Sequence, residues 1–109
     1  MSISVLILTL NEQANLPACL ASVRWCDDIV VLDSLSTDQT VEIATREGAC
    51  VIQRKFDNWA SHQNWAMDNI PFKYDWVFYL DADERMTDDL REEIQSISHD
   101  SQRQVAAYY

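Results

Sequence analysis

Four short segments of the chain are almost entirely apolar or aromatic, and each of them gives way to polar residues. Runs of this length and composition predict buried strands, and near-continuous apolar runs are typical of parallel sheets that are covered on both faces. The predicted strands comprise residues 3–8, 29–32, 50–52 and 75–80, and a fifth is predicted from residue 105 to the end of the chain.

Apolar residues between the first two predicted strands recur at helical spacing. Leu16, Leu20 and Val23 fall on one face of a helix at i, i+4 and i+7. Asn15 is expected to cap this helix at its N-terminus, and Pro17 is compatible with its first turn. The first helix therefore presents an apolar face to the predicted sheet.

A second helix is predicted before the third strand. Ser36 and Gln39 have the spacing of a capping box, in which the serine caps the start of the helix. Val41 and Ala44 would then face the core. Gly48 would follow the helix, at a position where a left-handed backbone is common.

Two further helices are predicted, over residues 58–70, which Pro71 closes, and over residues 87–97, which Thr87 caps. Strands that alternate with helices indicate βαβ units and a parallel sheet. We therefore expect one α/β domain over residues 1–109, with a Rossmann-like, mostly parallel sheet and flanking helices.

The aromatic residues are expected to lie in the core rather than on a ligand-binding surface. His62 is expected on a polar face of the third helix, since two histidines without partners at metal-ligand spacing do not form a zinc site. Trp25 and Cys26 are expected to pack at the end of the first helix. The aromatic residues assigned to the core are Trp59, Trp65, Tyr74, Trp76 and Phe78.

The composition limits the partners of this domain. A net charge of −10 and a pI near 4.3 disfavour nucleic acid, whose phosphates need Lys and Arg, and also attachment to anionic lipid by charge. Three cysteines without C-x-x-C spacing disfavour structural zinc and a disulfide framework, and they indicate reduced thiols in a cytoplasmic protein. The apolar stretch at residues 3–8 is too short for a signal sequence or a membrane span.

Ligands of parallel sheets bind beyond the carboxyl ends of the strands. Three of the predicted strand ends are followed by polar residues, which should converge on one edge of the sheet. An ionised Asp33 could accept the imide N–H of uracil, and the alternative for this residue is a cap or an ordinary loop position. The three polar strand ends are residues 9–12, 33–38 and 81–84.

The end of the fourth predicted strand carries three carboxylates within four residues, Asp81, Asp83 and Glu84. Such a cluster repels itself unless a cation or protons intervene. Asp81 and Asp83 flank the small Ala82, so both could hold one Mg²⁺ or Mn²⁺ whose other ligands are phosphate oxygens and water. The alternative is a solvated acidic turn before a helix, whose N-terminus favours negative charge.

Residues 9–12 (Thr-Leu-Asn-Glu), 29–38 and 81–85 resemble, in this order, the motifs of the family 2 glycosyltransferases of GT-A fold. The resemblance extends over residues 3–94 and points to bacterial enzymes that build lipopolysaccharide core and other surface glycans. It implies transfer of a sugar, with inversion, from a nucleotide-diphosphate sugar, a UDP-sugar, to a hydroxyl of a glycan or lipid-linked acceptor. It also implies a cytoplasmic location, with peripheral attachment at the inner membrane face open for the complete protein.

The resemblance assigns roles to individual residues. Asp33 would hold the uracil, and Asp83 would be the main ligand of Mg²⁺ or Mn²⁺. Glu12 would lie near the ribose or the base, and a solvated acidic residue before the first helix is the alternative there. The donor-binding residues implied are Thr9, Leu10, Glu12, Asp33, Gln63, Asp81 and Ala82, and the implied metal ligands are Asp83 and Asp81.

Three departures from the family pattern affect the functional prediction. Leu35 stands where the family usually has glycine, which matters if this position needs a positive φ or lies close to the ligand. Gln63 stands where relatives often have arginine, so a cationic contact to the nucleotide would be lost. The family's general base is a carboxylate well downstream, beyond Tyr109, so the catalytic residue is unknown and the acceptor-binding half is absent.

Two alternative functions remain. The chain could be a nucleotide-binding fragment that is catalytically incomplete, because its general base is missing. It could also be a receiver-like signalling domain, which is a parallel α/β fold with an acidic metal pocket. That domain would need adjacent acids after the first strand and a lysine after the fifth, and no lysine follows Lys73.

Overall fold

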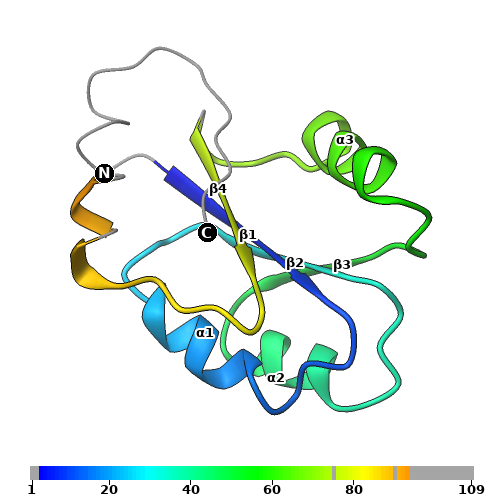
Figure 1. Cartoon of the computed structure of the whole chain (residues 1–109), viewed down its shortest axis with the longest axis horizontal. Helices are drawn as coiled ribbons and strands as arrows, with labels where there is room; N and C mark the ends of the chain where they lie inside the picture. The colour runs from blue at the N-terminus through cyan, green and yellow to red at the C-terminus, as the bar shows by residue number, and fades with distance from the viewer. Residues whose placement is uncertain (1–2, 75, 90, 94–109) are drawn as a thin grey trace.

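The computed structural model describes residues 3–74, 76–89 and 91–93, which form a parallel sheet with helices on both faces (Figure 1). The strands lie in the order β3-β2-β1-β4, and every neighbouring pair is parallel. The four predicted strands and the Rossmann-like arrangement are confirmed. Along the chain the elements are β1 (Ile3–Thr9), α1 (Leu16–Ser22), β2 (Ile29–Asp33), α2 (Thr40–Arg46), β3 (Cys50–Gln53), α3 (Trp59–Asn69) and β4 (Trp76–Asp81).

Residues 88–89 and 91–93 are helical, and the Arg91 N–H donates to the carbonyl oxygen of Thr87 over 2.9 Å. These residues match the start of the helix predicted over residues 87–97. The remainder of that helix and the strand predicted from residue 105 lie outside the described residues. Within the described part of the chain, no helix is long and apolar enough to cross a membrane.

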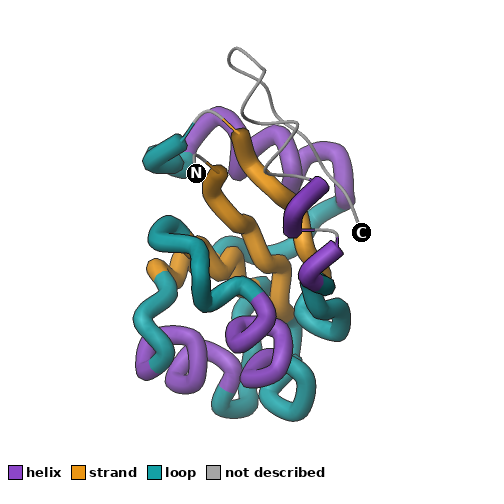
Figure 2. Tube along the Cα trace, turned by 90° about the vertical axis from the view of Figure 1, so that its left-hand side faces the viewer, coloured by secondary structure: helices purple, strands orange, loops and turns teal. Residues whose placement is uncertain are grey.

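The apolar residues of the strands alternate between two cores, one on each face of the sheet. Ile3, Val5 and Ile7 of β1 belong to the core under α1 and α2, whereas Leu6 and Leu8 belong to the core under α3. Two perpendicular views place α1 and α2 on one side of the strands and α3 on the other (Figure 1, Figure 2). Because both faces are covered, every residue of β1 is buried, as its continuous apolar run predicts.

The first helix, α1, follows its prediction in its apolar face but not in its cap. Asn15 occupies the N-cap position without capping the helix through its side chain. Its Nδ2 instead donates to Glu12 Oε1 over 3.2 Å. Trp25 and Cys26 pack against the core after this helix, as expected. The apolar face is buried at the predicted positions Leu16, Leu20 and Val23.

The second helix, α2, begins at Thr40, so the predicted capping box of Ser36 and Gln39 is wrong. The Ser36 hydroxyl donates to Asp33 Oδ1 over 2.5 Å instead. A buried carboxylate is unfavourable without hydrogen-bond donors. The serine hydroxyl therefore bonds to Asp33 rather than capping the helix. Asp38 acts at the helix start, where its Oδ1 accepts the Thr40 N–H over 2.9 Å.

The other predictions for α2 are met at Ala44 and Gly48, but only in part at Val41. Ala44 is buried, while Val41 is half-buried and the neighbouring Ile43 takes the more buried position. Gly48 follows the helix with a φ of 89°, a backbone conformation that residues with a Cβ atom rarely adopt. The predicted role of this glycine is therefore confirmed.

The third helix, α3, corrects two predictions. His62, expected on a polar face, is fully buried, and Trp59, expected in the core, is 57% exposed. The helix packs on the sheet through Ala66 and Ile70, with His62 buried one turn earlier on the same face. This orientation turns Trp59 away from the core. Among the other aromatic residues, Phe78 is buried and Trp65, Tyr74 and Trp76 are half-buried.

Candidate functional site

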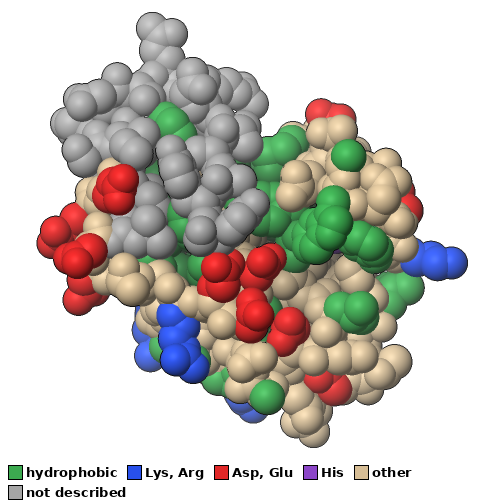
Figure 3. Space-filling view, viewed as in Figure 1, with side chains coloured by type: hydrophobic (Ala, Val, Ile, Leu, Met, Phe, Trp, Pro, Cys, Tyr) green, Lys and Arg blue, Asp and Glu red, His purple; other side chains and the backbone are tan. Residues whose placement is uncertain are grey.

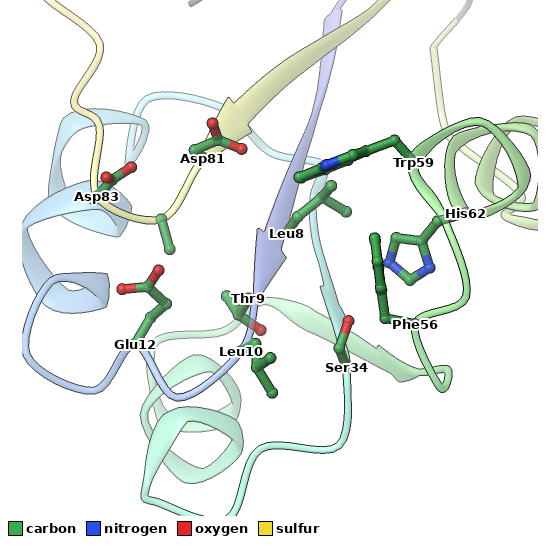
Figure 4. A pocket seen from close by; sticks show the side chains of 11 residues that line it. Leu8, Thr9, Leu10, Glu12, Ser34, Phe56, Trp59, His62, Asp81 and Asp83 are labelled. Atoms are coloured by element: carbon green, nitrogen blue, oxygen red, sulfur yellow. The ribbon is translucent and has the colours of Figure 1, made fainter.

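The carboxyl ends of β1, β2 and β4 meet at one edge of the sheet. In the strand register Thr9 lies opposite Asp33, and Leu8 lies opposite Asp81. The predicted convergence of the three strand ends is therefore confirmed. A cavity of about 420 Å³ opens at this edge (Figure 4) and is lined by Leu8, Thr9, Leu10, Glu12, Ser34, Phe56, Trp59, His62, Asp81, Ala82 and Asp83.

The cavity has an acidic end and an aromatic end. Glu12, Asp81 and Asp83 lie on one side of the close-up view, and Phe56 and His62 lie on the other (Figure 4). On the surface of this face, acidic and hydrophobic side chains likewise gather next to each other (Figure 3). A ligand that fills the cavity therefore needs one part that is compatible with negative charge and another part that is apolar.

The acidic end contains two aspartates in different environments. Asp81 is half-buried at the end of β4, and Asp83 is exposed. Burial, followed by the negative charges of Asp83 and Glu12, raises the pKa of Asp81. A divalent cation would offset this repulsion, and carboxylate oxygens suit Mg²⁺ or Mn²⁺. Among the described residues no three His, Cys, Asp or Glu side chains converge as a group that could hold an ion, so the aspartates would supply only part of a coordination shell.

Two side chains of α1 form hydrogen bonds with the backbone on either side of the acidic turn. The Cys19 thiol donates to the carbonyl oxygen of Asp81 over 3.7 Å, and Ser22 Oγ accepts the Met86 N–H over 2.9 Å. Burial, followed by nearby carboxylates of which Glu84 has the largest effect, raises the pKa of Cys19 to about 12. The thiol is therefore protonated. The contact of Cys19 joins residues 62 positions apart, which no local sequence pattern indicates.

Asp33 lies behind the cavity wall rather than on it. Its buried carboxylate accepts hydrogen bonds from the Thr9 hydroxyl at 2.6 Å, from the Ser36 N–H at 2.8 Å and hydroxyl at 2.5 Å, and from Gln53 Nε2 at 3.2 Å. Burial opposes ionisation, but these hydrogen bonds outweigh it and lower the pKa of Asp33. Since a carboxylate has about four acceptor positions, a base could bind Asp33 directly only by displacing one of these donors.

Two residues in the loops beside the cavity, Asn11 and Leu35, have a left-handed backbone. Asn11 has a φ of 54°, and its Oδ1 accepts the Thr37 N–H over 2.8 Å. Leu35 has a φ of 62° and is 50% exposed, so the glycine-like conformation considered for this position is confirmed. Leucine adopts it at a cost of about 1 kcal/mol.

The Glu12 N–H donates to Thr40 Oγ1 over 2.9 Å, which positions Glu12 at the acidic end.

The aromatic end is built from the segment after β3 and the first turns of α3. The ring centroids of Phe56 and Trp59 are 5.5 Å apart, and those of Phe56 and His62 are 5.3 Å apart. None of these three residues is among the predicted site residues. Helical spacing does not distinguish a core face from a site face. The useful signal is that Phe56 and the start of α3 follow the carboxyl end of β3, a parallel strand.

Gln63 lies outside the main cavity, in an adjoining hollow of about 310 Å³ that Trp59, Tyr79 and Asp81 also line. It and Asp33 are the two predicted donor-binding residues that do not line the main cavity. The predicted residues that do line it are Thr9, Leu10, Glu12, Asp81, Ala82 and Asp83.

A parallel sheet in the order β3-β2-β1-β4 with a cavity at its carboxyl edge defines an α/β protein of nucleotide-binding architecture. The sequence matches the profile of Glycosyl transferase family 2 over residues 4–107. The chain therefore belongs to the family 2 glycosyltransferases, as the motifs predict. Membership of this family rules out the receiver-like alternative.

Curated relatives belong to the same class of protein. An uncharacterized glycosyltransferase of Rickettsia typhi is 36% identical over 107 residues, which cover 95% of this chain and 36% of that protein. The lipopolysaccharide core biosynthesis glycosyltransferase LpsC of Rhizobium meliloti is 34% identical over 95 residues, which cover 83% of this chain and 34% of that protein. The chain thus spans about a third of the length of these relatives.

Solved structures of other proteins share the fold. TarS of S. aureus superposes with a TM-score of 0.71 at 22% identity, over 88% of this chain and 32% of that chain. Glucosyl-3-phosphoglycerate synthase from Mycobacterium tuberculosis, in complex with Mn²⁺ and UDP-glucose, has a TM-score of 0.63 at 28% identity, over 75% of this chain and 33% of that chain. The sheet is accordingly that of the GT-A fold.

Proposed function

We propose that the chain forms the nucleotide-sugar-binding part of a glycosyltransferase and binds a UDP-sugar together with Mg²⁺ or Mn²⁺. The observation that carries this proposal is the strand register. It places Asp81 beside Leu8 and Thr9 beside Asp33, so that the Asp-Ala-Asp turn and the end of β1 share one cavity. Three motifs that are weak individually therefore meet at a single site.

In this proposal Asp83 is the main metal ligand and Asp81 is the second. Both side chains offer hard oxygen atoms. Burial, followed by the negative charges of Asp83 and Glu12, raises the pKa of Asp81, and a cation would offset the repulsion between these charges. When bound, the metal would supply charge stabilisation for the diphosphate leaving group. The likeness to glucosyl-3-phosphoglycerate synthase, crystallised with Mn²⁺ and UDP-glucose, supports this assignment.

The remaining donor contacts are proposed to come from the cavity walls. Thr9, Leu10 and Ala82 line the cavity and would contact the nucleotide, and Glu12 would approach the ribose or the base. Asp33 would hold the uracil in one of two ways. It would accept a hydrogen bond from the uracil in place of one of its four present donors, or it would orient the Thr9 hydroxyl toward the uracil. Gln63, which lines the adjoining hollow, would make a further contact with the donor.

The proposed reaction is transfer of the sugar, with inversion, to a hydroxyl of a glycan or lipid-linked acceptor. The likeness to LpsC supports a role in lipopolysaccharide or surface-glycan synthesis. The general base and the acceptor-binding part are proposed to lie in sequence beyond these 109 residues, because the chain spans 36% of its Rickettsia relative. A cytoplasmic location, with or without peripheral membrane attachment, stays a prediction.

Thermal unfolding in the presence of ligands tests the nucleotide site. UDP at about a hundred times its dissociation constant should add about 2.7 kcal/mol to the free energy of unfolding. We expect UDP with Mn²⁺ to raise the melting temperature above its value with Mn²⁺ alone, and Mg²⁺ to act in the same direction. Uridine, which lacks the diphosphate, is the ligand control. Equal melting temperatures with and without UDP would contradict the proposal.

Transfer activity is a separate measurement. Because the proposed general base lies outside these residues, we expect the 109-residue chain to transfer no sugar from UDP-glucose to glycan or lipid-linked acceptors. Release of UDP that depends on an acceptor would show that a general base is present among these residues, and the proposal that it lies beyond them would then be wrong.

A further inference from the structure

His62 is a fully buried side chain at the aromatic end of the cavity, and the proposed function gives it no role. Its Nδ1 lies 3.0 Å from a guanidinium nitrogen of Arg54. An arginine side chain carries only hydrogen-bond donors, so Nδ1 accepts this hydrogen bond. A neutral histidine that accepts at Nδ1 carries its proton on Nε2, and the contact with Arg54 therefore selects the tautomer.

Neighbouring residues hold Arg54 in place and keep the imidazole neutral. Both terminal nitrogens of Arg54 donate to Asp57, over 3.0 and 3.1 Å, and the guanidinium lies 5.5 Å from the centre of the Trp65 ring. Burial, followed by the positive charge of Arg54, lowers the pKa of His62, while Asp57 acts in the opposite direction. His62 thus presents a single N–H in a direction that the protein determines.

The Nε2 of His62 is buried and has no hydrogen-bond partner among the residues that the structure describes. Figure 4 shows the imidazole at the cavity wall beside Phe56. The ring of Phe56, 5.3 Å away between centroids, offers at most a weak contact through its π face. A buried donor without an acceptor is unfavourable, and such donors are rare in native proteins. The arrangement therefore indicates a ligand that supplies the acceptor.

The surroundings of His62 indicate which acceptor fits. Phe56 and Trp59 border the same cavity and contact each other edge to face, yet they remain 40% and 57% exposed. Such side chains stack on flat rings, nucleobases among them. A neutral N–H donor suits a carbonyl oxygen, whereas a diphosphate with its metal fits the acidic end. A nucleobase combines a flat ring with carbonyl oxygens at its rim.

We propose that His62 is a specificity-determining residue of the donor site, whose Nε2–H donates to a carbonyl oxygen of the nucleobase while Phe56 and Trp59 cover the base. This inference rests on the proposed function, because it places the diphosphate of a bound nucleotide at the acidic end. Arg54 is then a positioning residue, since it acts on the ligand only through His62. Base recognition would be shared between α3 and the strand ends at Thr9 and Asp33.

Two ligands and three variants of the full 109-residue chain test the inference by calorimetric titration in the presence of Mn²⁺. UDP carries the base, and ribose 5-diphosphate offers the same diphosphate and ribose without it. His62→Phe removes the donor and keeps a flat ring, whereas His62→Gln keeps an N–H near the position of Nε2. Asn64→Ala removes an exposed side-chain amide from the same helix and is the matched control.

We expect His62→Phe to weaken UDP binding about tenfold, the effect of losing one hydrogen bond, and to leave ribose 5-diphosphate binding unchanged. His62→Gln should recover most of the UDP affinity, and Asn64→Ala should bind both ligands like the parent chain. This split between the two ligands separates loss of base recognition from a general disturbance of the fold.

A second measurement does not depend on the variants folding. In ¹⁵N-labelled parent chain, the imidazole N–H signal of His62, identified by its absence in His62→Gln or by assignment, should move downfield with UDP and not with ribose 5-diphosphate. An unmoved signal, or unchanged UDP affinity in folded His62→Phe, would overturn the role of His62 and leave the proposed function intact. Failure of the parent chain to bind UDP with Mn²⁺ would instead refute the proposed function, and this inference with it.

Discussion

The Thr9 hydroxyl donates to Asp33 Oδ1 over 2.6 Å, and this buried hydrogen bond joins the carboxyl ends of β1 and β2 beside the cavity. The two residues lie opposite each other in the strand register, although they are 24 positions apart in the chain. The contact completes the set of donors around the Asp33 carboxylate. It thereby links the stability of the sheet edge to the wall of the candidate site.

Thr9→Val removes this hydroxyl at nearly constant volume. The buried carboxylate of Asp33 would lose one of its donors, so we expect the free energy of unfolding to fall by about 2 kcal/mol. Urea denaturation measures the change. Thr45→Val makes the same substitution at an exposed position of α2 and is the control. A loss no larger than that of Thr45→Val would contradict the structural role of the Thr9 hydroxyl.

Asp33 should also make stability depend on pH. Its pKa is lowered in the folded state because hydrogen bonds outweigh the effect of burial. The carboxylate therefore contributes stability above its unfolded-state pKa of about 3.9, and this contribution is lost as the pH falls through the lower folded-state value. We expect the free energy of unfolding to decrease on acidification below about pH 4.

Thr9→Val distinguishes the contribution of Asp33 to the pH dependence of stability from the contributions of other carboxylates. The hydrogen bond of Arg54 is the main cause that lowers the pKa of Asp57 to about 2, so Asp57 contributes in the same direction. Asp57 does not contact Thr9, and its contribution should be the same in both proteins. The loss of stability with acid should therefore be smaller in Thr9→Val, and parallel curves for the two proteins would contradict the assignment to Asp33.

Leu35→Gly should stabilise the protein. Leu35 has a φ of 62°, where a Cβ atom is unfavourable, and its half-exposed side chain loses little buried area when it is removed. We expect a gain of about 1 kcal/mol in the free energy of unfolding. Leu35→Ala removes the same side chain but keeps the Cβ, and it should give no gain. Equal stabilisation by alanine would show that backbone strain is not the cause.

The three cysteines should differ in reactivity. Cys50 is exposed, whereas Cys19 and Cys26 are buried, and burial is the main cause that raises the pKa of both buried thiols. Since the thiolate is the reactive form, we expect iodoacetamide at about pH 8 to modify Cys50 in the native chain and all three cysteines after unfolding. Peptide mass spectrometry locates the modification. Rapid native labelling of Cys19 would contradict its packing against the Asp81 carbonyl.

Asp83→Asn tests the metal site. The substitution keeps the size of the side chain and removes its charge, so we expect the effect of Mn²⁺ on UDP-induced thermal stabilisation to disappear. Glu42→Gln makes the same change of charge at an exposed position of α2 that does not line the cavity. Stabilisation that still depends on Mn²⁺ in Asp83→Asn would remove Asp83 from the metal site.

Local sequence patterns were sufficient where the physical cause is local. The apolar runs predict the four strands because strands buried on both faces need apolar residues at every position. The acidic residues that follow β4 predict the acidic end of the cavity, because parallel strands present their carboxyl ends to the same edge of the sheet. The family's preference for glycine at the position of Leu35 indicates either a left-handed backbone or close approach to a ligand, and the observed φ of 62° matches the first, which is a constraint within one residue.

Other features depend on competition between partners, which no local pattern determines. Ser36 has the spacing of a helix cap, yet its hydroxyl serves the buried carboxylate of Asp33. Helical periodicity predicts α3 but not its orientation, and packing on the sheet selected His62 rather than Trp59 for burial. The sequence by itself therefore determined the elements, their order and the acidic turn. Only the tertiary structure decided which side chains bury, pair and face the cavity, because those choices depend on the free energy of contacts between residues far apart in the chain.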